Sequence, residues 1–155
     1  MLLDREVGKR VIKIVQHSDR ILLIRIKAEP VDIVILQIYM PTTDANDEEI
    51  ELIYEQIEEL MEKEKATDQV IVMGDWNAVA EEGRDGKEVR EFGLGMRNDS
   101  GQALIDFCKR SKLIVTNTWF QHEKRSRYTW KRPGDTGRYQ LDYNISSSST
   151  DTAIV

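Results

Sequence analysis

Three short segments rich in isoleucine and valine follow one another near the start of the chain, at 11–16, 21–27 and 32–39. Each partly alternates apolar and polar residues, which is typical of a β-strand with one buried face. Glu29 and Pro30 separate the last two segments and indicate a turn, because the residue before a proline is restricted to extended conformations. We therefore expect three consecutive strands in this part of the chain.

Helices and strands alternate along the rest of the chain. We expect a helix at 46–64, a strand at 69–73, a polar loop at 78–99, a helix at about 101–111, strands at 113–117, 127–130 and 139–145, and a Pro-Gly turn at 133–134. Asn46 or Asp47 is the expected N-cap of the first helix, and Ser100 that of the second. A loop as long as 78–99 in a compact domain is usually functional or disordered. The order of elements predicts a mixed α/β sandwich rather than a regular βαβ array.

Length and composition limit the classes of protein. A chain of 155 residues, 40% of them hydrophobic, suffices for one domain with a core. No apolar run approaches the roughly 20 residues that span a bilayer, and charges interrupt the N-terminus where a signal peptide is apolar. We expect no membrane partner. Cys108 is the single cysteine, which excludes an internal disulfide and fits an intracellular location, with the nucleus as one option.

Charge is unevenly distributed. The net charge of −6 argues against binding nucleic acid through overall charge. Residues 47–64 carry nine acids against one lysine, whereas residues 121–140 carry six lysines and arginines against two acids. The basic segment permits local contact with phosphates. The alternative is that both segments are solvated faces.

The end of the expected 69–73 strand carries the clearest chemical signal, the segment Gly74-Asp75-Trp76-Asn77. Functional groups in α/β folds gather where strands end in loops. Asp75 is able to accept a proton from water, and Asn77 to stabilise an oxyanion or bind a metal through its amide oxygen. The alternative is an Asx-turn that ends a strand.

Two further strands carry candidate polar residues. Tyr39 ends the third strand in the segment Ile38–Thr42, where its hydroxyl is able to reach a phosphate while the ring packs. Asp142 lies within an apolar strand, where an unpaired carboxylate is costly, so it is a candidate partner for a histidine. An ordinary amphipathic tyrosine and a surface aspartate are the alternatives.

Other catalytic patterns are missing from the sequence. His17 and His122 lack metal-ligand spacing, and we expect both at the surface. There is no Gly-x-Gly-x-x-Gly segment, P-loop or serine nucleophile elbow. A nucleotide-binding fold or a serine hydrolase is therefore without support.

In their order along the chain, these segments resemble the endonuclease/exonuclease/phosphatase (DNase I-like) family. The most similar branches are the RTE/LINE-type retrotransposon endonucleases and the craniofacial development protein 2-like proteins. The resemblance is carried by four stretches in register: SDRILLIRIK with IVILQIYMPT, VIVMGDWNAV, FGLGMRNDSGQALIDFCKRSKLIVTNTWFQ, and RYTWKRPGDTGRYQLDY. It implies a DNase I-like four-layer α/β sandwich, truncated at both ends, with a partial domain at 1–146 and a low-complexity tail at 147–155.

The resemblance also implies roles for individual residues. Asp75 is the expected base or water-orienting acid, Asn77 and Tyr39 contact the scissile phosphate, and Asp142 orients a catalytic histidine. Mg²⁺ is the expected cofactor, because phosphodiester cleavage builds charge on the phosphate oxygens and on the leaving 3′ oxygen. DNA is the expected substrate. The residues expected to contact it are Thr42, Trp76, Arg127, Tyr128 and Trp130.

Departures from the family pattern decide between functions. The family has a metal-binding glutamate near its start and a Ser-Asp-His motif near its end, and this sequence matches neither. We therefore expect no complete metal site and weak or absent DNA cleavage by this chain. A catalytically inactive module that binds protein or nucleic acid is the alternative, and a phosphatase of the same superfamily is a third reading.

Overall fold

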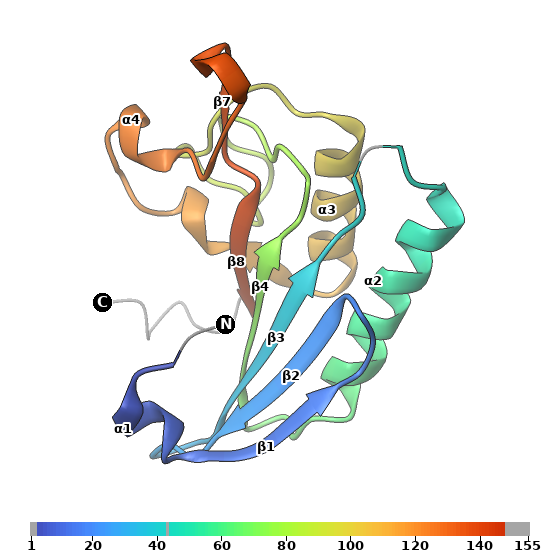
Figure 1. The fold of residues 1–155 in the computed structure, drawn as a ribbon, viewed down its shortest axis with the longest axis vertical. Coiled ribbons are helices and arrows are strands. Elements are labelled where there is room, and N and C mark those ends of the chain that lie inside the picture. Colours follow the sequence, from blue (N-terminus) through green and yellow to red (C-terminus); the bar gives the residue numbers. More distant parts are fainter. Residues whose placement is uncertain (1–2, 43, 148–155) are drawn as a thin grey trace.

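A mixed sheet forms the centre of the molecule in the computed structural model, which describes residues 3–42 and 44–147. Its six strands lie in the order β1-β2-β3-β4-β8-β5, and β6 and β7 form a separate two-stranded ribbon (Figure 1). The strands are β1 (Val11–Gln16), β2 (Ile21–Ile26), β3 (Ile33–Tyr39), β4 (Gln69–Asp75), β5 (Leu113–Val115), β6 (Trp130–Lys131), β7 (Arg138–Tyr139) and β8 (Asp142–Ser147). The helices are α1 (Arg5–Gly8), α2 (Asp47–Glu62), α3 (Asp99–Arg110) and α4 (Lys124–Arg127), with 3₁₀ turns η1 (Thr116–Thr118) and η2 (Pro133–Asp135).

The first three strands confirm the sequence-based prediction. They form an antiparallel meander, and the chain then crosses over through α2 so that β4 pairs with β3 in parallel. A parallel pair needs such a long connection, which a helix supplies. Strand β8 returns antiparallel to β4 and separates it from β5. The carboxyl ends of β3 and β4 therefore meet the start of β8 at one end of the sheet.

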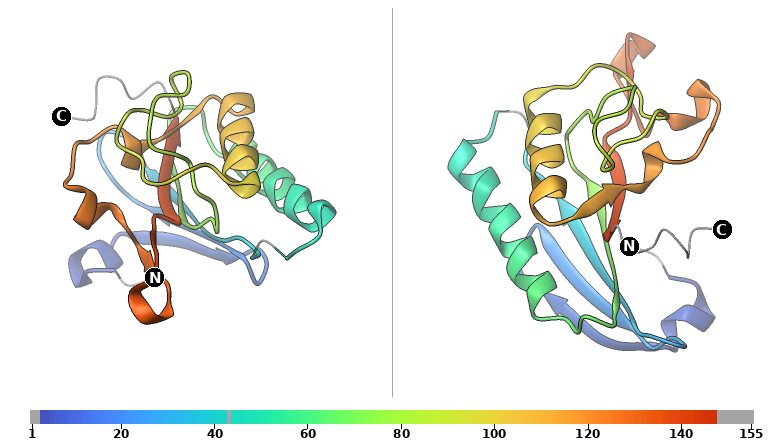
Figure 2. Two further views of the ribbon diagram at one scale, coloured as in Figure 1. Left: turned by 90° about the horizontal axis from the view of Figure 1, so that it is seen from above. Right: turned by 180° about the vertical axis from the view of Figure 1, so that it is seen from behind.

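Helices α2 and α3 cover one face of this sheet, as the view from behind in Figure 2 shows. Tyr54 of α2 and Phe107 of α3 pack with ring centroids 4.8 Å apart, and the ring of Trp76 lies 6.2 Å from that of Phe107. Leucine, isoleucine and valine side chains from β2, β3, β4 and β8 complete this core. The core fixes the strand ends that carry the candidate residues.

The other face of the sheet is also apolar but lacks a helix layer among the described residues. Facing positions in neighbouring strands form a row of four isoleucines, Ile14, Ile24, Ile35 and Ile71. Ile14 at the edge of the row is 63% exposed. A helix-covered, six-stranded mixed sheet agrees with the expected DNase I-like α/β sandwich, of which the described residues supply one helix layer and one sheet.

The polar loop at 78–99 is largely irregular, as predicted, but it is packed rather than loose. Ala78, Val79 and Ala80 are buried. The Asn98 side chain accepts hydrogen bonds from the backbone N–H groups of Val79 (2.9 Å) and Gly101 (2.8 Å). Asn98, not Ser100, is therefore the N-cap of α3. The loop is part of the frame behind the candidate site.

Three other predicted boundaries need correction. The strand expected at 113–117 ends at Val115, because η1 follows. The strand expected at 127–130 is mostly absent, because residues 124–127 form a helical turn closed by a hydrogen bond from the Ser126 N–H to the Glu123 carbonyl. Strand β8 reaches Ser147, one residue past the expected domain end, and the remaining expected tail, 148–155, lies outside the described residues.

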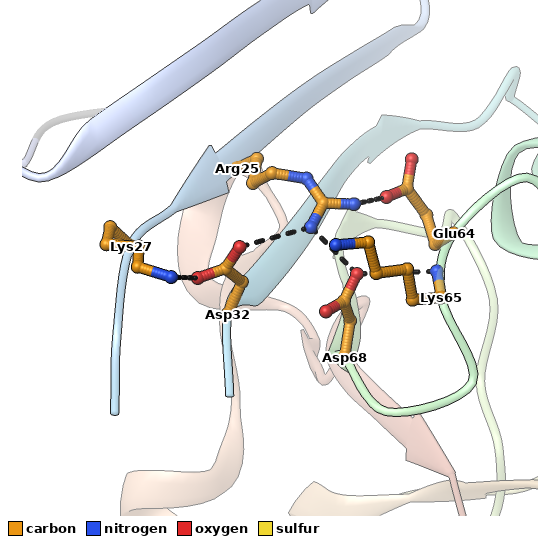
Figure 3. A network of polar contacts seen from close by, with 6 residues as sticks. All are labelled: Arg25, Lys27, Asp32, Glu64, Lys65 and Asp68. Carbon is orange, nitrogen blue, oxygen red and sulfur yellow. Dashed lines mark hydrogen bonds and ion pairs between the residues drawn. The ribbon is translucent and has the colours of Figure 1, made fainter. Parts of the chain in front are cut away.

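A cluster of charged side chains ties the opposite end of the sheet to the end of α2 (Figure 3). The Arg25 guanidinium on β2 donates to the carboxylates of Glu64 and Asp68, whose side chains are each 5% exposed. Asp32 pairs with Arg25 and with Lys27. The hydrogen bond to Asp68 and the two neighbouring carboxylates raise the pKa of Arg25. Buried charges are tolerated when they are paired in this way.

Candidate functional site

The register of the sheet brings three of the predicted residues side by side. Tyr39 on β3 faces Asp75 on β4, and Asp75 faces Asp142 on β8. Because facing residues of neighbouring strands project to the same side, the three side chains share one face of the sheet. They line one open cleft of ≈ 380 Å³, which also involves the turn between β1 and β2. Residues more than 100 positions apart in sequence thus form one candidate site.

A tight turn after β4 holds Asp75 in position. The backbone N–H of Asn77, a residue with φ of 46°, donates to the Asp75 carboxylate at 3.0 Å. The Asn77 side-chain amide donates to the Met40 carbonyl at 2.8 Å, and the Met40 N–H donates to the Asp75 carbonyl at 2.8 Å. Asn77 therefore adjoins the cleft through Asp75, and its amide joins the ends of β3 and β4.

Glycine is required just before Asp75. Gly74 has a φ of 146°, and a Cβ added there would lie 1.9 Å from the Ile38 carbonyl oxygen. No other residue allows this approach of the two strands without displacing the backbone. The Gly-Asp-Trp-Asn segment is therefore an Asx-turn and a candidate site at once, so its two interpretations do not exclude each other.

The environment of Asp75 disfavours its charged form. Burial raises the pKa of Asp75, the hydrogen bond from the Asn77 N–H lowers it, and the nearby Asp142 carboxylate raises it further. Asp142 itself is exposed, and its backbone N–H donates to the Thr129 hydroxyl at 3.1 Å. A carboxylate with a raised pKa is a stronger base than an ordinary aspartate, as water activation requires.

Arg20 is a site residue that the sequence analysis missed. It lines the same cleft, and its guanidinium lies 5.8 Å from the centroid of the Tyr39 ring. Tyr39 is 53% exposed, so the pair is accessible from solvent. The signal was available: Arg20 directly precedes the second strand, and antiparallel pairing with the third strand brings it to the end that carries Tyr39.

Strands β6 and β7 of the basic segment lie at the same end of the sheet as the cleft residues (Figure 1). Trp130 is 43% exposed and packs on Tyr139 with ring centroids 5.8 Å apart. The Arg138 guanidinium lies 5.0 Å from the centroid of the Tyr128 ring. Trp130 is exposed and Tyr128 is half-buried, and the contact of either with DNA stays a prediction.

Other predicted contacts differ in position. Trp76 is only 1% exposed and donates from its indole to the Tyr143 carbonyl at 3.2 Å, so it is a core residue and the prediction that it contacts substrate is wrong. Arg127 is half-buried and donates to the carbonyls of His122 and Gly93. Its guanidinium therefore holds the loops together. Thr42 is exposed, as are the side chains of both histidines.

The site offers hard oxygen donors suited to Mg²⁺. Asp75 and Asp142 face each other, and Mg²⁺ is usually held by one or two carboxylates together with water and phosphate oxygens. Among residues 3–42 and 44–147, no group of three or more acidic, histidine or cysteine side chains is arranged to hold a metal. The two carboxylates fit such an ion only when water or substrate completes its coordination.

Comparisons with known proteins agree with the fold described above. No family model matches the sequence. Among solved structures, the endonuclease domain of TRAS1, a telomere-specific non-LTR retrotransposon, superposes with a TM-score of 0.62 at 16% identity, covering 96% of this chain and 59% of that one. A humanised D. rerio TDP2 gives a TM-score of 0.57 at 10% identity, covering 90% and 52%. An endonuclease/exonuclease/phosphatase family protein from Leptotrichia buccalis gives 0.53 at 19% identity, covering 81% and 40%.

The chain has the DNase I-like fold of the endonuclease/exonuclease/phosphatase proteins. Its sequence is 34% identical over 145 residues to craniofacial development protein 2 of Bos taurus and 33% identical to that of Tragulus javanicus, in each case over 94% of this chain. The chain spans about a quarter of the length of these curated relatives. No helix of its described part is long and apolar enough to cross a membrane.

Proposed function

We propose that this chain carries part of the catalytic site of a Mg²⁺-dependent DNA endonuclease derived from a retrotransposon. The observation that supports the proposal is the alignment of Tyr39, Asp75 and Asp142 across three strands. The backbone N–H of Asn77 is hydrogen-bonded to the Asp75 carboxylate. The family fold and the nuclease names of its structural neighbours support the same reaction class. Such a protein would act on DNA inside the cell, and we propose a nuclear location on that ground.

The residues divide the chemistry of phosphodiester hydrolysis. Asp75 accepts a proton from the attacking water, whose oxygen bonds to phosphorus as the P–O3′ bond breaks, and the leaving 3′ oxygen takes a proton from solvent. Tyr39 donates to the phosphate oxygens, which gain charge in the transition state, and so does the second N–H of the Asn77 amide, the first being used by the Met40 carbonyl. Bound Mg²⁺, held by Asp75 and Asp142, would supply positive charge at the same oxygens.

The proposed turnover by this chain alone is weak or absent. Among the described residues, no histidine lines the cleft beside Asp142, and no third acidic, histidine or cysteine side chain is arranged with the two carboxylates to hold a metal. A catalytically inactive module that binds nucleic acid remains the second candidate. The exposed Trp130 and the half-buried Tyr128, which lie beside basic side chains, favour it, because aromatic rings stack on bases and arginines contact the backbone.

Plasmid nicking distinguishes the two functions. Supercoiled plasmid is incubated with purified wild type and with Asp75→Ala, each in Mg²⁺ and in EDTA, and open-circular DNA is measured over time. Slow nicking that needs both Mg²⁺ and Asp75 supports the endonuclease. Salt-sensitive DNA binding without nicking supports the binding module. Rapid Mg²⁺-dependent turnover would contradict our expectation that missing groups limit this chain, and nicking that persists in Asp75→Ala would contradict the assigned site.

A further inference from the structure

Among the described residues that line the candidate cleft, Arg20 is the only one with a positively charged side chain. The same lining contains three carboxylates, those of Asp19, Asp75 and Asp142. A polyanion that enters the cleft therefore meets mostly negative charge from the protein. Direct attraction of a phosphate by a side chain of the cleft lining depends on Arg20.

The backbone of Arg20 is fixed, whereas its side chain is held by weaker contacts. Its carbonyl accepts from the Tyr39 N–H at 2.9 Å, and its N–H donates to the Ser18 hydroxyl at 3.2 Å. Its guanidinium donates to the Tyr39 carbonyl at a long 3.5 Å and pairs with the Glu49 carboxylate at 3.0 Å. The guanidinium is thus anchored beside Tyr39 and paired with one carboxylate.

The Glu49 carboxylate pairs with the Arg20 guanidinium in the way that a phosphate oxygen would. It lies in the first turn of α2, and its carboxylate offers oxygen acceptors of the kind that arginine prefers. The side chains of Arg20 and Glu49 are 31% and 47% exposed, and such exposed pairs add little to stability. Exchanging Glu49 for a phosphate oxygen is therefore inexpensive for the fold.

We propose that Arg20 binds a DNA backbone phosphate beside the scissile one, and that Glu49 competes with this phosphate for the guanidinium. The inference rests on the proposed function and deepens it, because it names a specific binding residue and the group that opposes binding. Because Glu49 competes for Arg20, a higher concentration of an anion is needed to bind there. A DNA backbone, with its dense charge, displaces the carboxylate more readily than an isolated phosphate does.

DNA-binding measurements on a double-mutant cycle test this competition. Anisotropy of a fluorescein-labelled duplex is measured in EDTA, so that cleavage does not interfere, over a series of salt concentrations. Arg20→Gln is expected to weaken binding about tenfold and to reduce the salt dependence by about one phosphate contact. Glu49→Gln is expected to tighten binding several-fold. In the Arg20→Gln background, Glu49→Gln is expected to change nothing, since Glu49 acts through Arg20.

Two control variants remove the same charges elsewhere. Glu48→Gln neutralises the neighbouring exposed acid of the same helical turn, and Arg110→Gln removes an arginine that pairs with Glu58 and Glu51 away from the cleft. If Glu49→Gln tightens binding no more than Glu48→Gln, or tightens it equally without Arg20, the effect is the general field of α2 and the competition is overturned.

A phosphate titration separates this inference from the proposed function. The side-chain ¹⁵N–¹H signal of Arg20 is followed by NMR while inorganic phosphate is added to wild type and to Glu49→Gln. A shift at lower phosphate concentration in Glu49→Gln supports the competition even in a chain that fails to nick DNA. An unmoved Arg20 signal in both proteins overturns it, including in a chain whose Asp75-dependent nicking supports the proposed endonuclease.

Discussion

At the scale of single residues, the charged form of Asp75, which the proposed chemistry uses, destabilises the folded protein. Burial and the facing carboxylate raise the pKa of Asp75 above its ordinary value of 3.8. The folded protein therefore holds this proton more tightly than the unfolded chain does. Protonated Asp75 favours the folded state, and this stabilisation is lost as the pH rises from 3.8 through the pKa of Asp75 in the folded protein.

Asp75→Asn should therefore stabilise the protein at neutral pH. Asparagine keeps an oxygen for the Asn77 N–H and carries no charge, so the melting temperature at pH 7 should exceed that of wild type, and the difference should vanish at about pH 3. Differential scanning calorimetry over this pH range measures the effect. Asp135→Asn provides the opposite sign, because hydrogen bonds from Arg138 and Lys131 lower the pKa of Asp135 to about 2. A lower melting temperature for Asp75→Asn at pH 7 would rule out a strained carboxylate at this position.

The sequence was sufficient for some site residues and insufficient for others. Tyr39 and Asp75 were predictable because each ends an apolar strand, and Asp142 because an acid within an apolar segment calls for a partner. Alternation along β4 also implied the position of Trp76: with Asp75 facing the cleft, the next side chain must face the core. The pairing of Arg20 with Glu49 was not predictable, because it depends on how α2 lies across the end of the sheet.

At the scale of elements, one side chain joins the long loop to α3. Asn98 caps the helix and at the same time accepts from the Val79 N–H, and Val79 is only 6% exposed. Its position also explains Gly101, where a Cβ would lie 1.9 Å from the Val79 carbonyl oxygen. The sequence predicted the helix and the loop, with Ser100 as the cap. Serine and asparagine both favour the cap position, and only the contact with Val79 distinguishes them.

Asn98→Ala should destabilise the protein more than an ordinary cap deletion does. The loss of a helix cap costs about 1 kcal/mol, and leaving a buried N–H unpaired costs about 1–3 kcal/mol more. Urea unfolding followed by circular dichroism gives the free energy of unfolding. The matched control is Asn46→Ala, which removes the exposed cap of α2 and its single hydrogen bond to Glu48. Equal losses for the two variants would show that the contact of Asn98 with the loop adds nothing.

At the scale of the whole molecule, one end of the sheet carries the candidate cleft and the other carries the stabilising Arg25 cluster. The cleft lies where β3 and β4 end, and the Arg25 cluster lies where they begin (Figures 1 and 3). Between them, one face of the sheet is covered by α2 and α3, and the other exposes isoleucines such as Ile14. The pattern of hydrophobic residues predicted the strands on both faces. It did not show which face is covered, because both faces of β2 and β3 are apolar.

Removing the Arg25 guanidinium should therefore weaken the fold without altering the cleft. Arg25→Met leaves the buried carboxylates of Glu64 and Asp68 without their cation, which should cost roughly 3 kcal/mol in the free energy of unfolding. Arg125→Met is the control, since Arg125 and its partner Glu123 are 81% and 68% exposed and the loss should be about 0.5 kcal/mol or less. Urea unfolding measures both, and NMR titration reports the pKa of Asp75 in each folded variant. Because the cluster and the cleft lie at opposite ends of the strands, that pKa should equal the wild-type value. A large stability loss accompanied by a shifted pKa of Asp75 would show instead that the two ends are mechanically coupled through the sheet.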